Sequence, residues 1–371
     1  MHLTLHLTTA CNFNCRYCYS PPRSRGLDMS RDVIAQSLKF VTQNFSSNIG
    51  IIFFGGEPLL KKNLIEYTIE KCKIMERQKH YPTHFHYKVT TNGSLLDNDF
   101  LDFCKYTGLN IGLSVDGIKE AHNANRKLQN GDDTFHLIDQ KIDSLLTYQP
   151  GANALMVVTP VNVKFYSRSV KYLIDRGFRY IVASLNFAAT WSDKDLKELE
   201  RQYQQIAMLY KKWTVEDRKF YFSPFETKLA NHIRSNEDDT CSCQLSTKQI
   251  SIAPDGKIYP CVQFVKDGVS NTQYSIGDVW NGFNEKRETL FKESVTEKET
   301  CKQCLLKKRC YNTCSCLNWQ TTGNINTVSP LLCETERILI PIVDKLGAEL
   351  HKMKLPMFVQ KQYSVFLSHF A

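Results

Sequence analysis

The stretch Cys11-Asn12-Phe13-Asn14-Cys15-Arg16-Tyr17-Cys18 decides the fold and the chemistry that the rest of the chain serves. Its spacing, C-x3-C-x2-C, places three thiolates within eight residues. Three thiolates suit three irons of a cubane cluster, whereas a tetrahedral zinc or a fully ligated cluster needs a fourth ligand nearby. The triplet therefore predicts a cluster with one iron left open to a small chelating molecule. Buried or zinc-bound cysteines are the alternative.

Around this triplet, short apolar runs alternate with longer amphipathic segments, a rhythm typical of a parallel sheet covered by helices. Ser30, Asp97 and Ser192 are good N-caps for three of the helices. Six such repeats predict an α/β protein built as a partial (β/α)6, TIM-like barrel. The chemistry of such barrels lies at the carboxyl-terminal ends of the strands, and the triplet begins three residues after the first strand. The six strands are expected at residues 3–8, 50–54, 84–91, 111–115, 154–159 and 180–185.

Three further motifs follow the second, third and fourth expected strands. Gly55-Gly56-Glu57-Pro58 combines two glycines, which let a backbone approach a ligand closely, with a carboxylate that can accept a ligand ammonium. The other two motifs are Thr91-Asn92-Gly93 and Ser114-Val115-Asp116-Gly117, the latter followed by His122 and Arg126. A plain βα turn is the alternative for the Gly55-Gly56-Glu57-Pro58 motif taken alone.

Taken together over residues 3–185, these motifs resemble the radical SAM superfamily. The resemblance implies that the open iron of the Cys11, Cys15 and Cys18 cluster binds S-adenosylmethionine (SAM) and that Gly55, Gly56, Glu57 and Pro58 hold its methionyl amino group. It further implies that an electron, delivered by a flavodoxin or ferredoxin, cleaves SAM to methionine and a 5'-deoxyadenosyl radical, which takes hydrogen from carbon. The remaining cofactor-binding residues implied are Tyr17 along the adenine and Thr91 and Asn92 at the ribose side. In the S-x-D-G...H...R stretch they are Asp116, together with Ser114 and Arg126, which face the SAM ribose and carboxylate.

A second group of cysteines occupies the last third of the chain. Cys243 and Cys261 frame a C-x12-G-x4-C element, and Cys301, Cys304, Cys310 and Cys314 are followed by Cys333. This order resembles the SPASM extension of radical SAM enzymes; a zinc ribbon is the alternative, since C-x2-C suits zinc equally. The resemblance implies two auxiliary [4Fe-4S] clusters, and thus three clusters in all: an outer one on Cys301, Cys304, Cys310 and Cys333, and an inner one on Cys243, Cys261 and Cys314.

Two further cysteines, Cys241 and Cys316, lie near these ligands in the sequence. Cys241 is the candidate fourth ligand of the inner cluster, although alternate residues of an extended strand point to opposite sides, so Cys241 and Cys243 share a cluster only across a turn. Cys316 is either a spare cysteine or a thiol close to the cluster, and in the second case it is a candidate catalytic residue.

The composition excludes several classes of protein. Of the 371 residues, 42% are hydrophobic and 23% charged, no run approaches the roughly 18 apolar residues of a membrane span, and residues 1–10 lack the features of a secretory signal. We expect a cytoplasmic protein, in which eleven of the 14 cysteines have ligand-like spacings and serve metals rather than disulfides, with Cys72 and Cys104 as small core residues. The formal charge of +9 falls to roughly +4 once three clusters form, and the basic residues are scattered, which disfavours nucleic acid as a partner.

The expected domains are a radical SAM barrel over residues 1–215, a linker over 216–240, a SPASM domain over 241–340 and a helical tail over 341–371. The first boundary follows the last barrel helix, after which the composition shifts. The second opens the cysteine-rich region at Cys241.

The expected substrate class follows from one residue of the SPASM region that differs from the pattern of the sulfatase-maturing enzymes. Enzymes that oxidise a Cys or Ser of sulfatases to formylglycine resemble this chain but carry an Asp directly after the cysteine of the G-x4-C element, where this chain has Val262. The surrounding residues resemble maturases of ribosomally made peptides. We therefore expect a peptide maturase that forms an oxidative thioether or carbon-carbon cross-link in a precursor peptide.

Several alternatives stay open at this stage. The chain could be a peptide epimerase, an enzyme like the anaerobic sulfatase maturases, or an iron-sulfur electron-transfer protein. The electron-transfer protein is disfavoured because it would not need Glu57 or Arg126. The strand that feeds Cys11 already starts at Leu3, so either the barrel itself or a separate recognition protein would hold the leader of the peptide.

Overall fold

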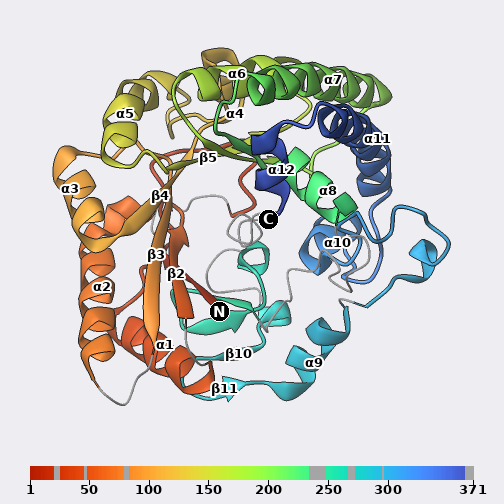
Figure 1. Cartoon of the computed structure of the whole chain (residues 1–371). Helices are drawn as coiled ribbons and strands as arrows, with labels where there is room; N and C mark the ends of the chain where they lie inside the picture. The colour runs from red at the N-terminus through yellow and green to blue at the C-terminus, as the bar shows by residue number, and fades with distance from the viewer. Residues whose placement is uncertain are drawn as a thin grey trace. The chain divides into compact units, whose positions relative to one another are not determined.

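A computed structural model of the chain describes residues 1–20, 26–45, 48–78, 83–233, 248–265, 272–294 and 296–363. It divides into two compact units that each draw on separate parts of the chain (Figure 1). Unit 1 comprises Met1–Ser114, Arg126–Ala152 and Cys243–Val295; unit 2 comprises Val115–Asn125, Asn153–Ser242 and Thr296–Ala371. In the described ranges, no helix is long and apolar enough to cross a membrane.

Unit 1 is an α/β layer whose four central strands run parallel in the order β1-β2-β3-β4. On the other edge of β1, β8 adds a further parallel strand, and an antiparallel ribbon of β9, β10 and β11 follows. The strands are β1 (His2–Thr8), β2 (Asn48–Gly55), β3 (His84–Thr91), β4 (Leu109–Ser114), β8 (Gln249–Ile252), β9 (Lys257–Tyr259), β10 (Gly277–Asp278) and β11 (Gly282–Phe283). The α-helices are α1 (Arg31–Asn44), α2 (Lys62–Arg77), α3 (Asn98–Thr107), α5 (Phe135–Tyr148) and α9 (Glu285–Ser294), with short 3-10 helices η1 (Pro58–Lys61), η3 (Val262–Phe264) and η4 (Thr272–Tyr274).

Unit 2 is built around three parallel strands in the order β5-β6-β7. These strands are β5 (Asn153–Val158), β6 (Tyr180–Leu185) and β7 (Tyr221–Phe222). The helices are α4 (Lys119–Asn125), α6 (Tyr166–Asp175), α7 (Asp193–Val215), α8 (Ser223–Ile233), α10 (Ser315–Thr322), α11 (Pro330–Lys352) and α12 (Pro356–Tyr363), with 3-10 helices η2 (Val163–Phe165) and η5 (Glu299–Cys301).

The six predicted strands are confirmed as β1 to β6, each followed by a helix. The three predicted caps are confirmed as well: Ser30 accepts from the amide of Val33, Asp97 from that of Phe100, and Ser192 forms a capping box at the start of α7. Cys72 and Cys104 are fully buried in α2 and α3, as expected of core residues.

Two features of the fold lay beyond the sequence patterns. The segment expected as a linker, 216–240, contains β7 and α8. With only two residues, β7 is too short to show a period-2 alternation. The cysteine-rich region is also shared between the units, because β8 pairs with β1 while the segment from Thr296 belongs to unit 2. The domain bounds themselves remain a prediction.

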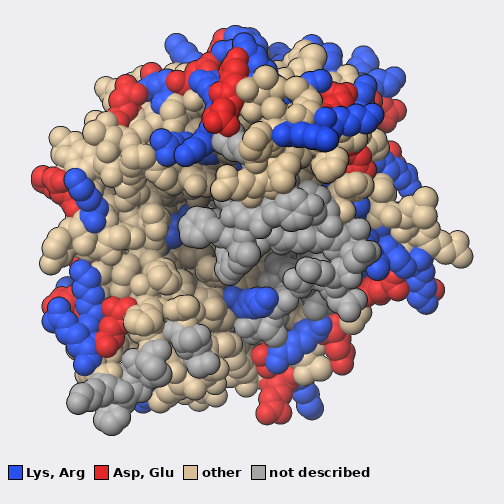
Figure 2. All heavy atoms as spheres, viewed as in Figure 1, with Lys and Arg blue, Asp and Glu red and all other residues tan. Residues whose placement is uncertain are grey.

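Charged side chains of both signs occur together on one face of the molecule. Figure 2 shows Lys and Arg interspersed with Asp and Glu on this face, mostly around its periphery. This distribution agrees with the scattered basic residues of the sequence.

Candidate functional site

The loop that follows β1 in unit 1 carries the three predicted cluster cysteines. The amide of Cys18 donates to the carbonyl of Cys15 at 3.0 Å, and the amide of Phe13 donates to Sγ of Cys11 at 3.4 Å. Burial, reinforced by the nearby charges of Glu57, Cys15 and Cys18, raises the pKa of Cys11 to about 12. The three thiols therefore share one loop and lie near one another.

The chemistry of this donor set fits a three-thiolate iron-sulfur cluster. Coordination removes the protons of thiols that would otherwise keep them, so a bound cluster would supply the charge that ionises Cys11. In the ranges that the structure describes, no three His, Cys, Asp or Glu side chains are close enough to hold a single metal ion. A cubane cluster is larger than a single ion and needs its thiolates farther apart. Three thiols on one loop are therefore compatible with a cluster even though they are too far apart for a single ion. The ligand assignment stays a prediction.

The two glycines after β2 are required by the chain's own backbone. A Cβ atom on Gly56 would lie 2.0 Å from the carbonyl oxygen of Ala10, and one on Gly55, whose φ is +126°, would lie 2.4 Å from that of Thr8. The close approach lets the amide of Gly56 donate to the Thr8 carbonyl at 2.8 Å and that of Glu57 to the Ala10 carbonyl at 2.9 Å. These contacts fix the end of β2 beside the segment that leads into Cys11.

Glu57 joins the ends of β2 and β3. Its carboxylate is 1% exposed and accepts hydrogen bonds from Thr91 Oγ1 at 2.6 Å, the Asn92 amide at 2.8 Å and the Leu59 amide at 3.0 Å. Burial raises the pKa of Glu57 to about 7, against the lowering effect of these bonds. Pro58 begins η1, for which Glu57 is the N-cap. Glu57 thus braces the site, and its predicted contact with a ligand ammonium remains a prediction.

Asn12 and Gln129 hold the cysteine loop, and the sequence motifs had not indicated either. Asn92 Nδ2 donates to Asn12 Oδ1 at 2.8 Å, and Asn12 Nδ2 donates to Ser94 Oγ at 2.8 Å, so the end of β3 is tied to the loop. Gln129 Nε2 donates to the carbonyl of Cys11 at 3.1 Å and to that of Phe13 at 2.9 Å. Amides far away in sequence thereby fix the loop backbone, a role that leaves no signal in local spacing.

Arg126 and Tyr17, predicted to contact the carboxylate and adenine of SAM, lie together in unit 1. The guanidinium carbon of Arg126 is 5.3 Å from the centroid of the Tyr17 ring, a cation-π distance, and Arg126 is 6% exposed. Nearby, the amide of Asn14 donates to the carbonyl of Lys127 at 2.7 Å, which ties the segment after Arg126 to the cysteine loop. Ser114 ends β4.

Asp116 and His122, from the same motif as Ser114, shape a turn in unit 2. The carboxylate of Asp116, 1% exposed, accepts from the amide of Val157 in β5 at 3.0 Å, and the Asp116 amide donates to Nδ1 of His122 at 3.3 Å. This geometry gives Asp116 a structural task, and its predicted part in cofactor binding remains a prediction.

One face of β1 carries an unsatisfied polar atom. Alternation puts His6 on the face opposite Leu5 and Leu7. His6 is 5% exposed, its ring meets that of Phe54 edge-on with centroids 5.3 Å apart, and its Nε2 atom has no hydrogen-bond partner among the described residues. Burial lowers the pKa of His6 to about 3, so the imidazole is neutral. A buried polar atom without a partner costs about 1 to 3 kcal/mol.

The cysteines predicted for the outer cluster lie in unit 2. The amide of Cys304 donates to the carbonyl of Cys301 at 2.9 Å, and both thiols lie near enough to Cys333 to add to the effect of burial in raising its pKa. Asn312 Nδ2 donates to Sγ of Cys310 at 3.2 Å. The grouping of Cys301, Cys304 and Cys333 is compatible with one shared cluster.

A buried ion pair supports the backbone beside Cys310. Lys228 in α8 is 1% exposed; its Nζ contacts both carboxylate oxygens of Glu336 at 2.8 Å and donates to the carbonyl of Arg309 at 2.7 Å. Arg309 in turn makes a bidentate pair with Asp344 at 2.6 and 2.7 Å. Through Arg309 the loop that carries Cys310 is held to α8 and α11.

The described residues that were predicted for the inner cluster belong to different units. Cys261, in unit 1, follows β9 and precedes η3, while Cys314 belongs to unit 2. Sγ of Cys316 lies 3.2 Å from Sγ of Cys314, so the candidate catalytic thiol is adjacent to a predicted ligand. Cys241 and Cys243 lie outside the described residues.

This fold and the arrangement of its cysteine loop define an iron-sulfur enzyme of the α/β class. The model of the radical SAM superfamily matches residues 5–199, and that of an iron-sulfur cluster-binding domain, SPASM, matches residues 241–305. The chain therefore belongs to the radical SAM superfamily and carries a C-terminal SPASM domain, as the motifs predicted. Members of this superfamily bind [4Fe-4S] clusters and SAM, which confirms the cofactors expected from the sequence.

The proteins similar to this chain include sulfatase-maturating enzymes and a protein solved with a precursor peptide. The chain is 24% identical to a cysteine-type anaerobic sulfatase-maturating enzyme of Clostridium perfringens, over 83% of this chain and 86% of that enzyme. The structure of anSMEcpe with bound AdoMet superimposes with a TM-score of 0.78 at 20% identity, covering 94% of this chain and 99% of that one. The structure of Streptococcus suis SuiB bound to precursor peptide SuiA superimposes with a TM-score of 0.63 at 15% sequence identity, covering 90% of this chain and 75% of that one. These likenesses confirm the fold class.

Proposed function

We propose that this radical SAM enzyme is a peptide maturase that closes an oxidative thioether or carbon-carbon cross-link in a ribosomally made precursor peptide. The observation that carries the proposal is Val262. Formylglycine formation needs a base beside the substrate hydroxyl or thiol, and the residue after Cys261 is the position of the Asp in sulfatase-type maturases. A valine there cannot take a proton. The likeness to SuiB, whose structure holds a precursor peptide, supports a peptide substrate.

In this proposal Cys11, Cys15 and Cys18 hold the reactive cluster, Glu57 fixes the backbone around the amino group of SAM, and Arg126 with Tyr17 covers its carboxylate and adenine. When bound, the cluster and SAM supply a 5'-deoxyadenosyl radical that removes a hydrogen atom from carbon. The protein contributes position: the hydrogen bonds of Asn12 and Gln129 keep the loop in one arrangement. The polar face of β1 around His6 is then available to the substrate.

The mass balance distinguishes the candidate reactions. Cross-linking removes two hydrogens from the peptide. One ends on 5'-deoxyadenosine, and the other leaves as a proton and an electron, for which the clusters that the SPASM cysteines would hold would be the acceptor. One SAM is consumed per cross-link, and the peptide becomes two mass units lighter. Epimerisation instead leaves the mass unchanged and needs a thiol to return a hydrogen.

The test is mass spectrometry of a precursor peptide encoded beside the gene, after anaerobic reaction with SAM and a reduced flavodoxin or ferredoxin. We expect a loss of two mass units with an intramolecular cross-link and no aldehyde. If the peptide instead gains one solvent deuterium at an α-carbon and its mass is otherwise unchanged, the reaction is epimerisation and not cross-linking. Reaction only in the presence of a second protein would show that the leader is held by a separate recognition protein.

Formylglycine formation is the second candidate, because relatives at 22–25% identity are named as sulfatase-maturating enzymes of the cysteine or serine type. A synthetic sulfatase-type peptide separates the two functions. Its conversion to the aldehyde by this enzyme would refute the cross-linking proposal. In that case a base other than the residue after Cys261 must act.

A further inference from the structure

Unit 2 contains a pocket of about 280 Å³ at the amino-terminal ends of β6 and β7. Tyr180 begins β6 and Tyr221 begins β7; the two residues are partners in the sheet, with ring centroids 6.3 Å apart. The reaction is expected at the carboxyl-terminal ends of the barrel strands. The pocket lies at the amino-terminal ends of these strands, and no part of the proposed mechanism uses it.

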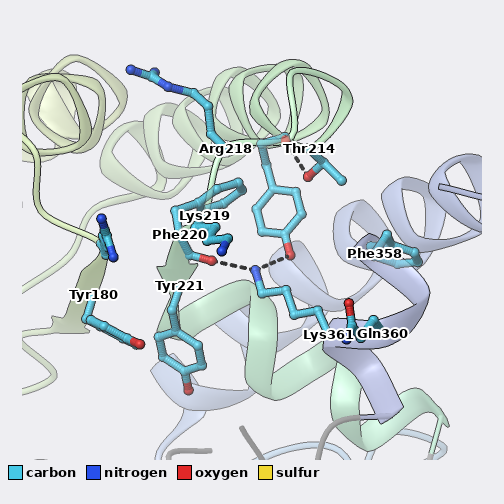
Figure 3. Close-up of a pocket in the computed structure, with 11 residues that line it drawn as sticks. Tyr180, Thr214, Arg218, Lys219, Phe220, Tyr221, Phe358, Gln360 and Lys361 are labelled. Atoms are coloured by element: carbon cyan, nitrogen blue, oxygen red, sulfur yellow. Dashed lines mark hydrogen bonds between the residues drawn. The ribbon is translucent and has the colours of Figure 1, made fainter. Parts of the chain in front are cut away.

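The floor of the pocket is preformed by Lys361 of α12 (Figure 3). Its Nζ donates to the carbonyl of Phe220 at 2.6 Å, contacts the carboxylate of Glu226, and lies 4.5 Å from the centroid of the Phe220 ring. The Lys361 side chain is only 15% exposed, and its neighbour on α12, Phe358, is 4% exposed. The ammonium is therefore engaged within the protein, and aromatic rings are left to form the walls.

The rim of the pocket is positively charged. Arg179 and Lys219 are exposed, and within the described ranges neither side chain has a hydrogen-bond or ion-pair partner. Arg218 beside them pairs with Asp175 at 3.4 Å. Two unpaired cations above aromatic walls are suited to a ligand that combines acidic groups with an apolar or aromatic side chain.

We propose that this pocket docks an acidic segment of the peptide substrate, with an aromatic or aliphatic side chain packed against the rings of Tyr180 and Tyr221 and neighbouring Asp or Glu residues on Arg179 and Lys219. The inference rests on the proposed peptide substrate and adds a second contact to it.

The test uses the anaerobically purified full chain and a synthetic probe, acetyl-Glu-Asp-Phe-Glu-Asp-Leu-Glu-amide, titrated by calorimetry in 50 mM salt. The variant Arg179→Glu/Lys219→Glu should weaken binding at least tenfold, and Tyr180→Ala should weaken it several-fold. The matched control is Lys194→Glu/Lys197→Glu, two exposed lysines of α7 in the same unit, which makes the same change in charge. The control should bind within twofold of the wild type. Binding should also fall as salt is raised, because the rim charges are exposed.

Three outcomes would overturn the proposal: equal weakening in the control and the rim variant, no measurable binding to the wild type, or displacement of the probe by millimolar inorganic phosphate. The last would identify a small-anion site. SAM cleavage without peptide should be unchanged in the rim variant. The enzyme could also bind the probe through the rim and yet modify no peptide. That result would support the docking site and refute the proposed function.

Discussion

Lys228→Met provides the clearest test of how unit 2 is held together. The substitution removes the ammonium that lies 2.8 Å from Glu336 and leaves a carboxylate that is 8% exposed without its cation. Breaking a buried pair from one side costs about 3 to 5 kcal/mol. In a domain of roughly 150 to 250 residues, each kcal/mol lost from the free energy of unfolding lowers the melting temperature by about 2 to 4 °C. We therefore expect the melting temperature to fall by about 6 to 20 °C.

The assay is thermal unfolding under nitrogen, with two comparison variants. Lys228→Met/Glu336→Met removes both charges and should recover most of the loss, because well-packed apolar residues replace a buried pair at little cost. Lys211→Met breaks the exposed pair with Glu349, whose side chains are 42% and 40% exposed, and should cost no more than about 1 kcal/mol. A single Lys228 variant that melts within 2 °C of the wild type, or a double variant as unstable as the single, would refute the reasoning.

The pH dependence of the same variant has a defined sign. Burial already raises the pKa of Glu336, and removal of Lys228 takes away the charge that lowers it. The folded variant then keeps a proton that the unfolded chain releases near its ordinary pKa of about 4.3. Its stability is therefore highest below that pH and falls as the pH rises toward the folded pKa. The deficit against the wild type should be smaller at pH 5.5 than at pH 8.

The remaining predictions concern the site in unit 1. Glu57→Ala and Arg126→Ala should each weaken SAM binding by about 1.5 to 3 kcal/mol with unchanged iron content; unaltered SAM affinity in both would mean that the site is misplaced. Gln129→Ala removes two hydrogen bonds to the cysteine loop, at about 0.5 to 1.5 kcal/mol each, and should speed loss of iron from the reactive cluster to a chelator. His6→Leu should preserve or raise thermal stability, because it removes an unsatisfied buried atom, while lowering peptide turnover; full turnover would show that His6 does not contact the substrate.

The order of strands and helices was predictable because each βα unit repeats the same local pattern. Buried leucines alternate in β1, and Ser30, Asp97 and Ser192 are N-cap residues directly before the helices α1, α3 and α7. The short strand β7 and the helix after it were missed, because two residues show no period. The pairing of β8 with β1 joins segments more than 240 residues apart, and neither segment alone signals it.

The site was predictable where a motif is contiguous and unpredictable where it is assembled from distant parts. The triplet, the two glycines and Glu57 stand out in the sequence, although the structure shows the glycines serving the backbone of Thr8 and Ala10. Asn12 and Gln129 look like ordinary polar residues until the fold brings them to the loop. The basic rim of Arg179 and Lys219 likewise forms only because β6 and β7 start side by side.

Reductive cleavage of SAM tests the central claim most directly. The anaerobically reconstituted protein should hold about twelve irons, and with dithionite it should convert SAM to 5'-deoxyadenosine and methionine. Changing Cys11, Cys15 and Cys18 together to Ala should remove about four irons and abolish 5'-deoxyadenosine formation. A triple variant that retains eight irons and still cleaves SAM would contradict the assignment of the reactive cluster to the loop after β1.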